Sequence, residues 1–219
     1  MIGIPIGLAL ANAGEWAIHR YVLHGLGRSR SSFWSFHWHE HHRNCRQNDS
    51  LDPCYRRPLT RWNAQSKEAL ALAAGTAAFL PLFPVAPLFV GTIAYCAVNY
   101  YRKHKRAHLD PGWAREHLPW HYDHHMGPNQ HANWCVTRPW FDHVMGTRVP
   151  YAGTEREARD RARRAARRRA RDGASAAAAQ RGAVAARRGA PAARRGAPAA
   201  AAAPGGAAAA AAQSGSAAP

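Results

Sequence analysis

Apolar residues gather in long runs in the first half of the chain, without the strict alternation that is typical of strands. The first run covers residues 2–23, which as a helix is about as long as the hydrocarbon core of a bilayer. Within it, Glu15 and His19 lie four residues apart and share one helical face. An ionisable pair inside a membrane helix is costly and therefore indicates function. The alternative is a surface amphipathic helix with incidental polar residues.

The second apolar region covers residues 68–101 and is too long for a single membrane span. Pro81, Pro84 and Pro87 divide it, which predicts two helices over residues 67–80 and 87–101, joined by the uncharged turn 81–86. Each arm is short for a full span, so we expect a shallow hairpin or helices that extend past the core. A buried helical hairpin in a soluble protein is the alternative.

Charge orients these segments. Residues 20–67 and 102–115 are rich in Lys and Arg, whereas the turn 81–86 has no charged residue. The positive-inside rule places the two basic regions in the cytosol and the turn outside. The sequence thus predicts an all-α, integral membrane protein of a bacterial-type inner membrane, with a short transmembrane bundle and a cytosolic, histidine-rich helical cap.

Composition changes abruptly near Gly153. From there the chain is almost entirely Ala, Arg, Gly and Pro, and it carries 14 arginines against four acids, about +10 of the net charge of +17. Such a segment buries too little apolar surface to offset its ordering entropy, which predicts a folded domain over residues 1–152 and a disordered basic tail over 153–219. We expect the tail to lie on anionic lipid headgroups in the cytosol. No nucleic-acid motif accompanies it, so nucleic acid is not an expected partner, and deleting the tail should leave activity intact.

The four cysteines form no Cys-x-x-Cys pair, which favours reduced thiols and a cytosolic setting for the loops that carry them. The apolar start lacks a positively charged n-region, so a cleavable signal peptide is not expected.

The chain contains 14 histidines, and all but His131 and His143 fall in tight groups. The groups are His19 with His24, His37 and His39 with His41 and His42, His104 with His108, His117 alone, and His121 with His124 and His125. Neutral imidazole is the commonest metal ligand in proteins, and these groups exceed what one tetrahedral zinc needs. They predict a site for two metal ions built from several helices, to which the i,i+4 pairs His37/His41 and His104/His108 and the i,i+3 pair His39/His42 would converge.

Imidazole ligands suit iron, zinc, copper or nickel. Iron would activate dioxygen towards an unactivated C–H bond and zinc would activate water for hydrolysis, and spacing alone does not choose between them. Carboxylates normally orient such imidazoles, and the candidates are Glu15, Glu40, Glu116 and Asp123.

The histidine pattern, the hairpin between its two halves and the ending Asp142-x-x-x-Gly146-Thr147 together resemble the fatty acid hydroxylase/sterol desaturase superfamily over residues 12–150. The resemblance implies a non-haem di-iron membrane enzyme that uses O2 and a separate electron-transfer protein to hydroxylate or desaturate a lipid. It implies as metal ligands His19, His24, His37 or His39, His41, His42, His104, His108, His121, His124 and His125. Residues 19–25 also resemble the first histidine box of carotenoid hydroxylases, so a carotenoid or sterol is the alternative substrate to a fatty acyl chain.

Two departures from the family pattern stand out. Trp38 occupies the position of the leading histidine in the second box, which leaves open whether His37 or His39 replaces it. The chain starts at the first box and has no fused haem domain, so we expect it to lack a transmembrane segment of longer members and to need an external electron donor. A third hypothesis is a non-catalytic membrane protein that binds iron or zinc.

Overall fold

The computed structural model describes residues 1–189, and all regular structure among them is helical. The predicted all-α class is therefore confirmed for this part of the chain. The α-helices are α1 Gly3–Ala17, α2 Arg43–Gln47, α3 Ala64–Ala77, α4 Pro87–Leu109, α5 Pro111–His117, α6 Pro119–Met126, α7 Trp140–Val144 and α8 Glu155–Gly189. Two π-helical segments, η1 Ile18–Leu23 and η3 His37–His42, and three short 3-10 turns, η2 Leu26–Arg28, η4 Pro53–Arg56 and η5 Leu80–Leu82, complete the set.

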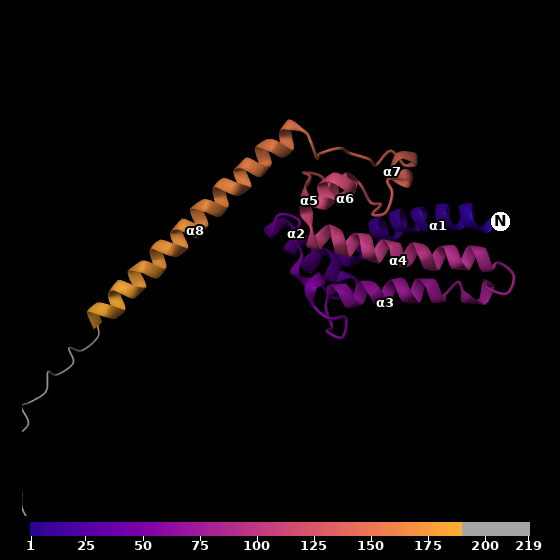
Figure 1. The fold of residues 1–219 in the computed structure, drawn as a ribbon, viewed down its shortest axis with the longest axis horizontal. Coiled ribbons are helices and arrows are strands. Elements are labelled where there is room, and N and C mark those ends of the chain that lie inside the picture. The colour runs from indigo at the N-terminus through magenta and orange to yellow at the C-terminus, as the bar shows by residue number, and fades with distance from the viewer. Residues whose placement is uncertain (190–219) are drawn as a thin grey trace, which may run out of the picture. The chain divides into compact units, whose positions relative to one another are not determined.

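Three helices form the scaffold of the domain. Helices α1 and α3 each pack against α4, which lies between them (Figure 1). Gly7 allows α1 to approach α4 closely, because a Cβ on this residue would stand only 2.8 Å from Cβ of Thr92. The expected hairpin is present with small shifts of its boundaries, and α4 continues beyond residue 101 to carry His104 and His108.

The predicted membrane-spanning helices are not confirmed. Among residues 1–189, no helix combines the length and the apolar character that crossing a bilayer requires. Helix α3 has 14 residues, short of the roughly 20 needed, and the longer α4 carries a basic second half.

The connection between α6 and α7 is held by carboxylates of α1 and α7. The carboxylate of Glu15 accepts hydrogen bonds from the backbone N–H groups of Val136 and Thr137, both at 2.9 Å. Asp142 accepts bonds from the backbone N–H groups of Trp134 at 2.8 Å and Cys135 at 2.9 Å. This loop is therefore held in one conformation, although it contains little regular structure.

The prediction of a disordered tail from residue 153 is wrong for its first part, since α8 runs from Glu155 to Gly189. Alanine has the highest helix propensity and arginine ranks close behind it, so an Ala/Arg-rich segment forms a helix without burying a core face. The part of the tail beyond residue 189 lies outside the described residues. The chain divides into two compact units at Arg167 and Arg168, within α8, whereas the boundary between a 1–152 domain and a tail stays a prediction.

The start of α8 is anchored by Glu157, whose side chain is buried. Its carboxylate accepts two bonds from Arg115, at 2.6 and 2.7 Å, and one from the N–H of Gly153 at 2.7 Å. Burial alone would raise the pKa of Glu157, but these partners outweigh it and lower the pKa from 4.5 to about 2.

This shift predicts a loss of stability in acid. The folded-state pKa lies below the unfolded one, so the stabilisation is complete above about pH 4.5 and disappears as the pH falls through about 2, amounting to at most about 3 kcal/mol. Thermal unfolding of detergent-purified protein across this pH range should show a steeper loss for the wild type than for Glu157→Gln. The exposed Glu155→Gln serves as the matched control and should behave as the wild type. Equal pH dependence in Glu157→Gln and the wild type would contradict the assignment.

Candidate metal centre

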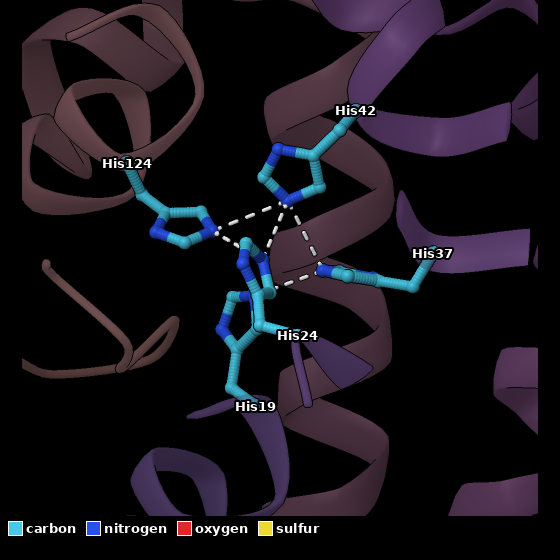
Figure 2. Close-up of side chains that lie close together, drawn as sticks. All are labelled: His19, His24, His37, His42 and His124. Carbon is cyan, nitrogen blue, oxygen red and sulfur yellow. Dashed lines mark hydrogen bonds between the residues drawn. The ribbon is translucent and has the colours of Figure 1, made fainter. Parts of the chain in front are cut away.

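Five buried imidazoles meet through their Nε2 atoms beside η1, the π-helical segment that continues α1 (Figure 2). They belong to His19, His24, His37, His42 and His124, which we call the first cluster. The Nε2 atoms of neighbouring rings lie 2.9 to 3.2 Å apart. Nitrogen atoms that stand at right angles around one metal ion, each about 2.1 Å from it, are separated by about 3.0 Å. The spacing of this donor set therefore fits a single metal ion.

The two π-helical segments explain how these rings come together. His19 and His24 are five residues apart, as are His37 and His42. A π turn bonds residues five apart, as the 2.9 Å bond from the N–H of His24 to the carbonyl of His19 shows, and so it brings both rings of each pair to one face. The expected pairing of His37 with His41 and of His39 with His42 is wrong, because an α-helical repeat does not apply there.

Two overlapping groups lie beside the first cluster, one of His104, His108, His121 and His125 and one of His41, Cys45, His108 and His125. We call their five histidines the second cluster; Cys45 lies on the Nδ1 side of His108, at 3.3 Å. His104 and His108 are one turn apart on α4, as predicted, and their Nε2 atoms are 3.2 Å apart. The Nε2 of His121 lies 2.9 Å from that of His108. Among the described residues, Nε2 of His41 and both ring nitrogens of His125 are buried without a hydrogen-bond partner. Buried polar atoms without partners are costly, so this donor set also fits a metal ion.

The two clusters share a border. His41 and His42 are consecutive but contribute to different clusters, and so do His124 and His125. The rings of His42 and His125 have centroids 4.3 Å apart, and those of His124 and His125 are 5.2 Å apart. The two clusters are therefore neighbours in one site rather than two isolated sites.

Backbone carbonyl groups orient three of the rings. The Nδ1 atoms of His19, His124 and His108 lie 2.6, 2.7 and 3.0 Å from the carbonyl oxygens of Trp134, Ala132 and Ser50. A carbonyl oxygen can only accept a hydrogen bond, so each Nδ1 must be the nitrogen that carries the proton. The Nε2 atom of each ring then presents a free lone pair to the cluster.

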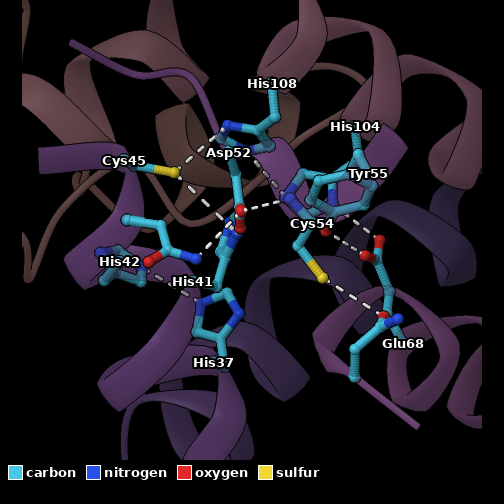
Figure 3. Close-up of polar contacts among 12 residues, drawn as sticks. His37, His41, His42, Cys45, Asp52, Cys54, Tyr55, Glu68, His104 and His108 are labelled. Atoms are coloured by element: carbon cyan, nitrogen blue, oxygen red, sulfur yellow. Dashed lines mark hydrogen bonds and ion pairs between the residues drawn. The ribbon is translucent and has the colours of Figure 1, made fainter. Parts of the chain in front are cut away.

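Two carboxylates orient rings of the second cluster (Figure 3). Glu68 accepts from Nδ1 of His104 at 2.6 Å and also from the hydroxyl of Tyr55. Asp52 accepts from Nδ1 of His41 at 2.9 Å. Burial alone would raise the pKa of Asp52, but the bond from His41 and those from the N–H of Cys54 and from Asn44 hold it below its usual range. Asp52 is thus an ionised partner of its imidazole, whereas burial raises the pKa of Glu68 to about 7.

The sequence pattern does not indicate these two acids, and the four acids that it does indicate orient no imidazole of either cluster. Glu15 binds the loop around Val136, and Asp123 pairs with Arg148 at 2.7 Å. Glu40 and Glu116 are exposed. In the sequence, Glu68 is an acid at the start of an otherwise apolar run, and Asp52 belongs to a Leu-Asp-Pro triplet at residues 51–53 that recurs at residues 109–111.

A family model described as fatty acid hydroxylase matches residues 4–147. The chain belongs to the fatty acid hydroxylase family. The resemblance seen in the sequence is thereby confirmed. No curated protein and no solved structure matches the chain. The matched range contains every histidine of both clusters, and α8 lies outside it.

Of the histidines that the family pattern suggests, one is not brought into either cluster. His39 is half-buried, and its Nε2 lies 2.9 Å from the carbonyl oxygen of Arg28. The geometry therefore favours His37 over His39 in the second box of this hydroxylase-family chain. His117, His131 and His143 also lie outside both clusters.

Burial affects the protonation of the clustered rings. It lowers the pKa of His42, His108, His121 and His125 well below the ordinary value of 6.5, and neighbouring imidazoles add to the shift. The rings are therefore neutral at physiological pH. Neutral imidazole is the form that binds a metal ion.

An apolar cavity of about 320 Å³ leads to the clusters from between the scaffold helices. One end is lined by Leu10, Phe79 and Ile93, and the other by His19, His37, His41 and His104. The cavity therefore connects the apolar faces of α1, α3 and α4 with histidines of both clusters.

Proposed function

We propose that this member of the fatty acid hydroxylase family is a di-iron, O2-dependent hydroxylase of a membrane lipid. The observation that carries the proposal is the joining of two imidazole clusters to the end of an apolar cavity. A metal site in this position suits a substrate that presents a C–H bond and has no polar group near it.

The proposed ligands are the ten clustered histidines. The first ion would be held by His19, His24, His37, His42 and His124, and the second by His41, His104, His108, His121 and His125. Iron in these positions would supply the activation of dioxygen. The net reaction consumes one O2, two electrons and two protons, inserts one oxygen atom into the C–H bond and releases the other as water. The electrons come from a separate electron-transfer protein.

The residues of the chain contribute positioning and exclusion of water. The carbonyl oxygens behind His19, His108 and His124 and the carboxylates of Glu68 and Asp52 fix the ring orientations before metal binds. The almost entirely apolar wall of the cavity keeps the alkyl chain of the substrate beside the clusters. Ring orientation and substrate placement are thus both set by the folded protein.

We further propose that the enzyme is associated with a membrane and that its histidine side faces the cytosol. The family relationship and the basic segments around residues 20–67 and 102–115 support this proposal.

The test is incorporation of oxygen-18 from labelled O2. Detergent-purified protein loaded with iron, supplied with a chemical reductant and membrane lipid extract, should give a hydroxylated lipid whose new oxygen carries the label. Protein that holds metal but consumes no O2 with any lipid or reductant would instead support a metal-binding protein without catalysis. Label that enters from water would indicate hydrolytic chemistry and overturn the proposal.

A further inference from the structure

We propose that the cavity between α1, α3 and α4 holds a single unbranched alkyl chain, and that Gly75 and Phe79 set the length of chain it accepts beyond the attacked carbon. The inference rests on the proposed hydroxylase function, because that function defines which end of the cavity is reactive.

The cavity follows one face of each scaffold helix. On α3 this face includes Glu68, Leu72 and Gly75, spaced by three or four residues, and Phe79 follows two residues after the helix ends at Ala77. Glu68 contacts His104 at the histidine end, and Gly75 lies about 10 Å further along the helix. The cavity is therefore long in the direction of the helices. Such a shape fits an extended alkyl chain better than a sterol ring system.

Polar groups in the middle of the cavity have partners within the protein. Both carboxylate oxygens of Glu15 accept bonds from Thr137, and the hydroxyl of Thr76 donates to the carbonyl of Leu72 at 2.8 Å. At the histidine end, by contrast, the Nε2 atom of His41 has no partner among the described residues, and the side chain is 1% exposed. We call the part of the cavity away from the histidines its stem. The polar groups of the stem are hydrogen-bonded within the protein, whereas the histidine end keeps a polar atom without a partner among residues 1–189.

Glycines leave room along this stem. A Cβ built on Gly14 of α1 or on Gly75 of α3 would meet no atom within 4 Å, and both residues line the cavity. They differ in this from Gly7, which is needed for helix packing. At the far end, Phe79 lines the cavity, and its ring packs against Phe89 with centroids 5.7 Å apart. A larger residue at 75 should shorten the stem, and a smaller one at 79 should lengthen it.

The test is displacement of the fluorescent fatty acid cis-parinarate from the full-length, detergent-purified protein by unbranched saturated acids from octanoate to stearate. Gly75→Leu should weaken competition by stearate about tenfold or more and leave octanoate within about threefold. Phe79→Ala should shift the preference to longer acids. Gly91→Leu is the matched control, because Gly91 also has open space around its Cβ but lies on α4 outside the cavity.

Opposite shifts in the two variants support the inference, since a general folding defect would not move the preference in two directions. A Gly75→Leu profile equal to that of Gly91→Leu, or competition by a sterol as strong as that by stearate, overturns it. The hydroxylase proposal is tested separately by oxygen-18. If labelled product forms but the two variants keep the length preference of the wild type, the function stands and the length limit does not. Length shifts without any O2 consumption leave the binding inference standing without the function.

Discussion

Replacing His124 by alanine is expected to remove one metal ion from the protein and to abolish turnover. His124 contributes to the first cluster alone, where its Nε2 lies 3.1 and 3.2 Å from those of His24 and His42. Loss of a residue that only orients a ligand weakens metal binding about 10- to 100-fold, and loss of the ligand itself should cost at least as much. Because both ions are needed, lipid hydroxylation should fall by more than about 100-fold.

The measurement is metal content of detergent-purified protein by mass spectrometry, together with product formation. The wild type should contain about two irons per chain, and His124→Ala about one. His121→Ala, in the second cluster, should show the same stoichiometry through loss of the other ion. His39→Ala is the matched control and should retain both, because its ring lies outside the clusters. One zinc per chain that survives His124→Ala would exclude the two-metal site.

The parts of this centre that follow a simple helical repeat could be predicted from the sequence. His104 and His108 share a face of α4 because residues four apart on an α-helix always do. The division of the histidines in residues 37–42 between the two clusters could not be predicted in this way. A π turn has no sequence signature of its own, and here it places His37 with His42 and assigns His41 to the other cluster.

The acids that orient the rings also escaped prediction, for a different reason. Glu68 is 36 residues from His104, and its role depends on how α3 packs against α4. Spacing along the chain carries no information about such a contact. Glu15 lies four residues from His19 and so shares its helical face, yet its carboxylate binds the backbone of the loop after α6.

In residues 155–189, burial and helix propensity lead to different predictions. A segment of Ala, Arg and Gly has too few apolar side chains to form a core, but a helix rich in alanine does not need one. Helix α8 from Glu155 to Gly189 follows local propensity, and its first turn adds the contact between Glu157 and Arg115.

Replacing Glu68 by alanine should weaken the second metal site and destabilise the fold together. The substitution leaves Nδ1 of His104 without its carboxylate and removes the acceptor of the Tyr55 hydroxyl, both in buried positions. The Tyr55 hydroxyl and Nδ1 of His104 lie 3.0 Å apart and can bond each other, so about one partner is lost and the free energy of unfolding should fall by about 1–3 kcal/mol. Without the carboxylate, the His104 ring is free to rotate, and metal affinity at this cluster should fall about 10- to 100-fold.

Competition with a chelator for bound iron measures the affinity, and thermal unfolding of the metal-free protein measures the stability. Tyr55→Phe separates the two roles of Glu68, because it removes one donor to the carboxylate and leaves the bond to His104 in place. It should lower stability by about 1 kcal/mol and change metal affinity much less than Glu68→Ala does. Glu40→Ala, which alters an exposed acid within the second histidine box, is the control and should change neither quantity. If Glu68→Ala released iron no faster than Glu40→Ala, the ring of His104 would have to be held by the packing of α4 alone, and the carboxylate would have no part in metal binding.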